Sequence, residues 1–125
     1  MYFHEYDSSY DPSLPVVEIS VGALRDGPFT TLTALVDSGA DATAIPLRYL
    51  DQIAALPVER RWLSGVTGER HLVSLYEVYL RIGEFGQYLA VVGDAFGQEA
   101  TVGRDILNHY VVKLDGPALV VEIHP

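Results

Sequence analysis

The segment that most constrains this chain is an apolar run that ends abruptly in a carboxylate. Residues 29–36 are rich in Thr, Leu and Val, as strands are, and Asp37-Ser38-Gly39 follows directly. A buried or half-buried carboxylate is costly unless it is paired or hydrogen-bonded. Chains tolerate that cost where a carboxylate in an unusual environment is useful. Asp37 is therefore the first candidate for a functional residue, although Asp, Ser and Gly are also ordinary turn residues.

The composition describes one domain with an acidic surface. The 125 residues fit a single domain, and 49% apolar residues suffice for a core. The absence of cysteine excludes disulfides, thiolate metal sites and a cysteine nucleophile. A net charge of -9 argues against nucleic acid and a membrane surface as partners. The N-terminal residues lack the basic and apolar regions of a signal peptide, so we expect a cytoplasmic protein.

Short β-type segments alternate with turn signals along the chain. We expect residues 1–14 to form an N-terminal arm and residues 15–125 to form the folded domain. About nine short β segments and two short helices predict a mainly β domain, barrel-like or sandwich-like. The clearest β segments are residues 17–21, 29–36, 60–66, 70–82, 87–92, 110–114 and 119–123.

Two local patterns interrupt the strands. Apolar residues at helical spacing predict a helix over residues 46–56, with Pro46 in the first position and Pro57 just past the end. A second, shorter helix is predicted after Gly103. Between them, two β segments are joined by residues 65–68, which predicts a hairpin with a mobile tip that carries two glycines.

The order of these motifs adds weight to Asp37. Asp-Ser-Gly alone is a weak signal, but here it closes a strand and precedes Ala40. About 60 residues later comes Thr101-Val102-Gly103-Arg104-Asp105-Ile106-Leu107, an apolar segment with a glycine that opens the second helix. The hairpin lies between the two motifs. This order, over residues 16–123, resembles the retropepsin-like (retroviral-type, single-lobe) aspartic protease family, and is closest in style to its cellular and bacterial members.

The resemblance implies a closed, mainly β acid-protease barrel lobe that works as a homodimer. Each chain would supply one catalytic aspartate, here Asp37, with Ser38 and Gly39 in supporting roles. The chain carries one such motif, so activity would require two copies. The implied partners are a peptide or protein substrate and a second copy of the chain. The implied chemistry needs no cofactor and no metal.

The resemblance also assigns binding roles. The hairpin tip would be the flap that closes over bound peptide, and Arg104 would pair with Asp41. The dimer interface would use residues 16–20 or the N-terminal arm, residues 119–123 and the loops around Asp37. The implied substrate-binding residues are Gly39, Ala40, Asp41, Gly65, Val66, Thr67, Gly68, Thr101 and Val102.

Two hypotheses stay open on the sequence alone. The first is an aspartic endopeptidase in which a dyad of two Asp37 side chains activates water, with activity below about pH 7. The second is a catalytically inactive, protease-like module that binds extended peptides or mediates dimerisation. The four histidines are scattered without the spacing of metal ligands, and we interpret them as structural or surface residues.

Overall fold

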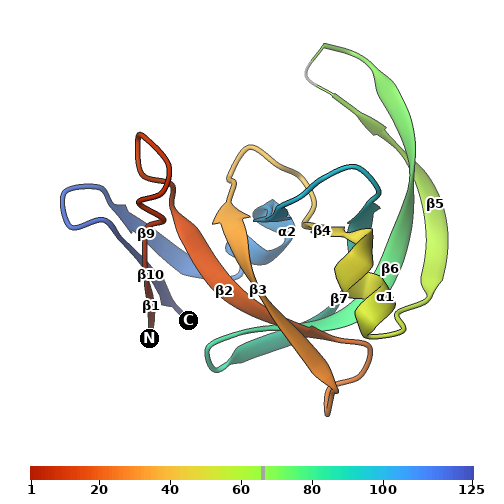
Figure 1. Cartoon of the computed structure of the whole chain (residues 1–125), viewed down its shortest axis with the longest axis horizontal. Coiled ribbons are helices and arrows are strands. Elements are labelled where there is room, and N and C mark those ends of the chain that lie inside the picture. The colour runs from red at the N-terminus through yellow and green to blue at the C-terminus, as the bar shows by residue number, and fades with distance from the viewer. Residues whose placement is uncertain (66) are drawn as a thin grey trace.

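The computed structural model describes residues 1–65 and 67–125, with 55% strand and 8% helix. Six strands form a closed barrel (Figure 1). In order around the barrel they are β2 (Val16–Gly22), β3 (Phe29–Val36), β8 (Ala100–Val102), β4 (Ala44–Pro46), β7 (Phe85–Asp94) and β6 (Arg70–Ile82). The ring closes because β2 also pairs with β6, with Val21 opposite Leu80. The predicted closed, mainly β lobe is confirmed.

The barrel interior is filled by side chains that alternate along its strands. In β2, Val17, Ile19 and Val21 are fully buried, whereas Glu18 between them is exposed. The neighbouring β3 repeats the pattern with Thr31 and Thr33 exposed. Each fully buried Val or Ile stabilises the fold by about 1.5–3 kcal/mol relative to an exposed one. This alternation fixes the register, because a slip by one residue would turn the apolar set outward.

Two short helices interrupt the strands in the described part of the chain. The second, α2 (Arg104–Leu107), begins directly after Gly103 as predicted. The first, α1 (Leu47–Gln52), is shorter than the prediction over residues 46–56. Neither helix in the described part of the chain is long and apolar enough to cross a membrane.

The helix α1 stops early because its end is capped. The N–H of Ala54 donates to the carbonyl of Asp51 at 3.1 Å, and the N–H of Ala55 donates to that of Leu50 at 3.0 Å. These two bonds form a Schellman motif, with Ala54 in the left-handed region at φ 53°. The predicted last turn is wrong: Pro57 disfavours helical backbone at the residue before it, so the chain leaves the helix and enters a strand.

A long hairpin projects from the barrel beside α1. It consists of β5 (Pro57–Ser64) and the first half of β6, with Ser64 opposite Arg70 at the tip. At the tip, the N–H of Gly65 donates to the carbonyl of Glu69 at 2.7 Å, and Gly68 adopts φ 85°. Figure 1 shows this hairpin arching away from the barrel. The predicted hairpin with a two-glycine tip is confirmed.

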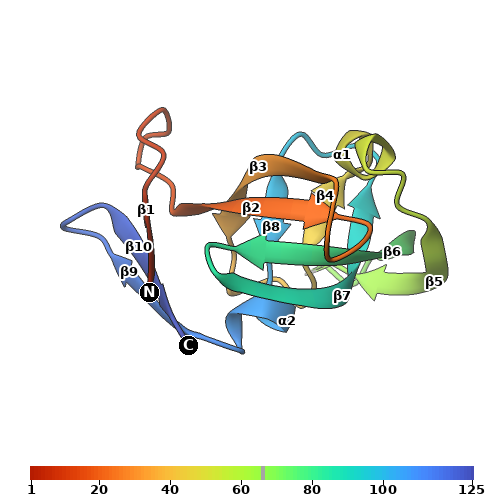
Figure 2. The ribbon, with the colours of Figure 1, turned by 90° about the horizontal axis from the view of Figure 1, so that it is seen from below.

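A second, three-stranded sheet lies at the other end of the barrel (Figure 2). Its order is β1 (Tyr2–Glu5), β10 (Val120–His124) and β9 (Val111–Asp115). Val121 and Ile123 of β10 are fully buried in the core. The residues expected to form an arm therefore begin with a strand of the fold, and the loop after it is closed by a bridge between Asp7 and Leu14.

Candidate active site

The loop that carries Asp37 emerges from a parallel pair of strands. Val36 of β3 lies opposite Val102 of β8, and the N–H of Asp37 donates to the carbonyl of Val102 at 3.0 Å. The chain then turns tightly, because the N–H of Ala40 donates to the carbonyl of Asp37 at 3.2 Å. The N–H of Gly39 donates to Oδ1 of Asp37 at 2.9 Å. The half-buried carboxylate is therefore held in place by its own turn.

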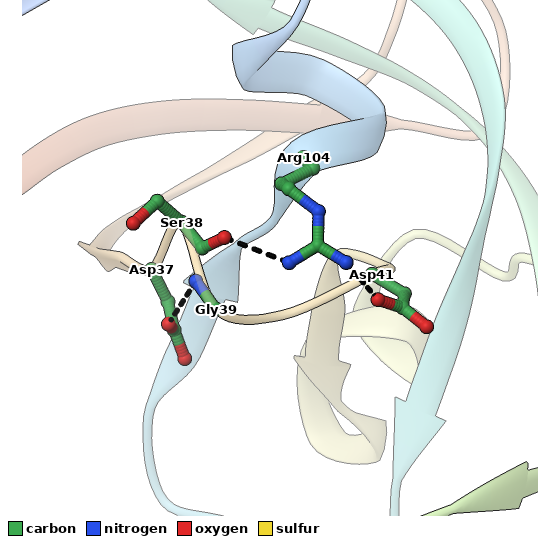
Figure 3. Close-up of polar contacts among 5 residues, drawn as sticks. All are labelled: Asp37, Ser38, Gly39, Asp41 and Arg104. Carbon is green, nitrogen blue, oxygen red and sulfur yellow. Dashed lines mark hydrogen bonds and ion pairs between the residues drawn. The ribbon is translucent and has the colours of Figure 1, made fainter.

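Arg104 fixes the far side of this loop. Its Nη1 donates to the carbonyl of Ser38 at 2.8 Å, and its Nη2 forms an ion pair with Oδ1 of Asp41. Its backbone N–H donates to the carbonyl of Ala40 at 2.9 Å. In Figure 3 the guanidinium lies between Ser38 and Asp41, and the carboxylate of Asp37 points away from it. The Asp41–Arg104 pair implied by the resemblance is thus present, and it leaves Asp37 without a cationic partner among these residues.

Thr43 and Asp105 form a second anchor of the loop, which the sequence did not predict. Thr43 is fully buried; its hydroxyl donates to Oδ1 of Asp105 at 2.7 Å and accepts from the N–H of Gly103 at 3.1 Å. The N–H of Thr43 donates to Oδ2 of Asp105 at 2.9 Å. In the sequence, the position of these residues is the one indication of their contact: Thr43 lies two residues after Asp41, and Asp105 directly follows Arg104. The two loops are therefore joined by two charged contacts, one exposed and one largely enclosed.

Gly103 lets these two loops approach each other closely. A Cβ atom placed on it would lie 2.8 Å from the carbonyl carbon of Ala42 and 2.9 Å from the oxygen of Ala40. Both neighbours are backbone atoms, which cannot move aside without shifting the loop. The glycine that the sequence placed before the second helix is required by this contact.

A cavity of about 560 Å³ opens between the hairpin and the barrel. From the hairpin it is lined by Leu63, Ser64, Gly65, His71, Leu72, Val73, Ser74 and Tyr76, and from the barrel side by Ala44, Leu47, Val92, Gly93, Asp94, Ala95 and Phe96. Most of these side chains are apolar. Ala44 is the first residue of β4, the strand that follows the Asp37 loop, whereas Asp37 itself is not part of the cavity wall.

The loop after β7 holds an aromatic side chain in solvent beside this cavity. Oδ1 of Asp94 accepts from the N–H of Phe96 at 3.0 Å and from that of Gly97 at 2.8 Å. Nη2 of Arg48 donates to the carbonyl of Gln98 at 2.9 Å. Phe96 is 95% exposed as a result. A fixed loop with an exposed aromatic ring can pack on an apolar group that enters the cavity.

The predicted substrate-binding residues do not all lie in one place. Of the predicted flap residues, Gly65 lines the cavity, whereas Thr67 and Gly68 lie at the hairpin tip and Val66 lies outside the described residues. Thr101 is half-buried in β8, and the side chain of Val102 belongs to the core rather than to the cavity wall. The cavity residues from the first half of β6 and from the loop after β7 were not singled out, because neither segment carries a motif.

The hairpin carries positive charge on an otherwise acidic chain. Arg61 is paired with Glu59 at 2.9 Å, and the guanidinium of Arg70 lies 5.0 Å from the ring centroid of Trp62.

At the tip of the hairpin, a hydrogen bond from the Thr67 hydroxyl, and then the contact with His71, lower the pKa of Glu69 from its ordinary value. The ionised carboxylate of Glu69 thus connects Thr67 and His71 at the tip of the hairpin.

Only carboxylate chemistry has a clear geometric basis in this region. Among the residues that the structure describes, no three His, Cys, Asp or Glu side chains lie close enough to hold a metal ion. The site offers one half-buried carboxylate on a braced turn, backbone groups beside it, and a mainly apolar cavity under a hairpin. A single carboxylate can act as a general base, and two such groups side by side can act as acid and base together.

Several solved protein structures have a fold similar to that of this chain. No family profile and no curated protein sequence matches the chain. The structure of the EIAV protease with the inhibitor HBY-793 superposes with a TM-score of 0.59 and 18% identity, over 77% of this chain and 86% of that one. A retropepsin-like aspartic protease from Rickettsia conorii gives 0.53 and 15%, over 87% and 91%.

A much longer viral chain contains a unit of similar fold. The foamy viral protease–reverse transcriptase in complex with an RNA/DNA hybrid gives a TM-score of 0.55 at 18% identity, over 78% of this chain and 12% of that one. Across these three structures the match is one of fold. The chain has the retropepsin-like fold, the fold of single-lobe aspartic proteases.

Proposed function

We propose that this chain is one half of a homodimeric aspartic endopeptidase, with Asp37 of each copy forming the catalytic dyad. The observation that carries the proposal is the Asp37 turn on a retropepsin-like barrel. Asp37 directly follows a buried strand. Among the described residues, the N–H of Gly39 alone donates a hydrogen bond to its carboxylate. The rest of the loop is braced by Arg104 and Asp105. A rigid support around a lightly bonded carboxylate suits a catalytic group.

The chemistry follows from placing two such carboxyl groups side by side. Two carboxylates within a few ångströms cannot both ionise, so the pair shares one proton. The ionised group takes a proton from a water molecule, whose oxygen attacks the scissile carbonyl carbon. The protonated group donates a hydrogen bond to the carbonyl oxygen. The resulting tetrahedral diol collapses as the dyad protonates the amide nitrogen and the carbon–nitrogen bond breaks.

The substrate proposed is an extended peptide. The cavity between the hairpin and the barrel is mainly apolar, and its walls Leu63, Leu72 and Val92 suit an apolar side chain of the peptide. The hairpin tip would cover the peptide, with Gly65, Val66, Thr67 and Gly68 as the proposed flap residues. Gly39, Ala40, Asp41 and Thr101 are the proposed contacts on the opposite side. A cytoplasmic location stays a prediction from the sequence.

The proposal is tested by replacing Asp37 with Asn and measuring cleavage of a peptide library at mildly acidic pH. We expect Asp37→Asn to lower kcat/KM by at least about a hundredfold, since it removes the general base. Asp26→Asn is the control, because Asp26 is also a turn aspartate but is exposed and lies before β3, at the opposite end of that strand from Asp37. Unchanged cleavage by the Asp37 variant would refute the dyad. Peptide binding without cleavage in the wild type would favour a binding module.

A further inference from the structure

A second cavity, of about 100 Å³, lies between β3 and the loop that joins β1 to β2. Its apolar wall includes Leu14 and Leu35, and Asp7 and Glu99 contribute carboxylates to its lining. None of these residues takes part in the catalytic step proposed above. The cavity thus combines an aliphatic wall with negative charge.

Backbone contacts hold this cavity near Asp37. Asp7 and Leu14 pair in a bridge between strands, with N–H to carbonyl distances of 2.8 and 3.0 Å. The next residue, Pro15, accepts a hydrogen bond from the N–H of Val36 at 3.0 Å. Val36 directly precedes Asp37. The loop that bears Asp7 is therefore attached to the end of β3 that carries the candidate catalytic carboxylate.

The outer side of β3 leads from the cavity to Asp37. The even-numbered residues of 32–36 are buried in the core, so alternation turns Leu35 to the other side. Asp37 continues this row about 7 Å beyond Leu35 along the strand. On the neighbouring strand β8, Thr101 lies opposite Leu35, and Glu99 comes two residues earlier in the chain. A peptide whose scissile bond lies at Asp37 therefore has a side chain within reach of the cavity.

The cavity wall carries negative charge that no base of the chain neutralises. Within the described part of the chain, neither Asp7 nor Glu99 forms an ion pair. The hydroxyl of Ser9 donates to Oδ1 of Asp7 at 2.6 Å, and the N–H of Ser9 donates to the same atom at 3.0 Å. These bonds lower the pKa of Asp7, so its carboxylate stays ionised at mildly acidic pH. A cleft lined by one sign of charge attracts groups of the opposite sign.

We propose that this cavity selects a lysine or arginine side chain of the peptide substrate, within two residues of the scissile bond. The inference rests on the proposed function and adds the substrate class: a basic residue here, and an apolar residue in the cavity under the hairpin. The aliphatic part of the basic side chain packs on Leu14 and Leu35. Its charged end reaches the carboxylates of Asp7 and Glu99, which determine the specificity.

Other side chains fit this cavity less well. An apolar side chain would take water away from Asp7 and Glu99 and offer no hydrogen bond in return, which is unfavourable for carboxylates. An acidic side chain would meet charge of its own sign. The preference is therefore for a cation. It should depend most on Glu99, because Asp7 already accepts two bonds from Ser9.

Cleavage of a peptide library, with the products identified by mass spectrometry, tests the selection. We expect Lys or Arg to be enriched within two residues of the cleaved bonds. Two peptides of one cleaved sequence, with Lys or norleucine at that position, then give the magnitude. Glu99→Gln should lower kcat/KM for the Lys peptide by about tenfold or more, as for the loss of a hydrogen bond to a charged group, and change it little for the norleucine peptide. Glu84→Gln, in the exposed turn between β6 and β7, is the matched control.

A charge-reversed variant separates selection from a structural role of Glu99. Glu99→Lys should cleave a third peptide, with Glu at the same position, faster than the Lys peptide. Cleaved bonds with no enrichment of basic residues would overturn the proposal. Equal losses for the Lys and norleucine peptides in Glu99→Gln would also overturn it, because a structural role predicts that result.

The selection and the protease proposal fail separately. If the wild-type chain cleaves no library peptide, binding is measured by fluorescence anisotropy with two labelled octapeptides of Ala and Val, which carry a central Lys or norleucine. Tighter binding of the Lys octapeptide, lost in Glu99→Gln, keeps the selection and removes the proposed activity. Equal binding of the two octapeptides overturns the selection. Cleavage without a preference for basic residues keeps the activity and removes the selection.

Discussion

The buried hydroxyl of Thr43 gives the sharpest test of how the active-site loop is held. Thr43→Val keeps the shape and volume of the side chain but removes the oxygen that joins the two loops. That oxygen donates to Oδ1 of Asp105 at 2.7 Å and accepts from the N–H of Gly103 at 3.1 Å. The variant leaves the backbone bond from the N–H of Thr43 to the same carboxylate. It therefore isolates the hydroxyl.

The expected loss follows from the two bonds. A hydrogen bond to a charged group contributes about 1.5–3 kcal/mol, and leaving a buried N–H without a partner costs about 1–3 kcal/mol. Because one oxygen serves both contacts, we expect a combined loss of about 3 kcal/mol rather than the full sum. A domain of this size has a free energy of unfolding of about 5–15 kcal/mol. The variant should fold, with a large share of its stability removed.

Urea denaturation followed by circular dichroism measures the effect. With a slope of about 1–3 kcal/mol per molar urea, the midpoint should fall by about 1–3 M. Thr33→Val is the control, because Thr33 is exposed on β3 and should change stability by less than about 0.5 kcal/mol. Thr43→Ser keeps the hydroxyl and should recover most of the loss. A Thr43→Val variant as stable as the control would refute the account of how the loops are joined.

Three further variants or conditions test other parts of the structure. Ala54→Gly should raise the free energy of unfolding by about 0.5–1 kcal/mol, because glycine relieves the left-handed backbone at φ 53°; a loss measured by urea denaturation would contradict this. Gly103→Ala should lower it by about 1–3 kcal/mol through the backbone contacts at 2.8 and 2.9 Å, whereas Gly116→Ala, with no atom within 4 Å, should change it little; equal effects would refute the steric reason. At the hairpin tip, the pKa of Glu69 is lowered from 4.5, so the contribution of its bonds is complete above that pH and is lost as the pH falls through the lowered value. Limited proteolysis with an acid-active protease should cut the tip faster at the lower pH, and Thr67→Ala should remove part of that dependence; a tip indifferent to pH would contradict it.

The sequence predicts the parts of this fold that depend on local pattern. Alternation identifies β2 and β3, and the glycines identify the tip of the hairpin between β5 and β6. The Asp37 turn stands out because a carboxylate directly follows a buried strand. These features depend on neighbours within a few residues, so one strand or one turn suffices to show them.

The remaining features depend on distant parts of the chain. Strand β4 has three residues and no period of its own; it exists because β7 and β8 flank it. The bonds among Thr43, Gly103 and Asp105 join positions about 60 residues apart, as the sequence numbering shows. The order of the small sheet places β10 between β1 and β9, which no single segment encodes. Closure of the barrel brings the loop positions together, and so decides how the Asp37 loop is anchored.

Mixing wild-type and Asp37→Asn chains tests the central proposal most directly. A dyad needs an aspartate from each copy, so a mixed dimer with one Asp37 should be inactive. After exchange of subunits at equal amounts and constant total protein, peptide cleavage should fall to about a quarter of the wild-type value, the share of dimers with two intact copies. A fall to about a half, in proportion to the wild-type chain alone, would show that a single Asp37 suffices and would contradict the shared dyad.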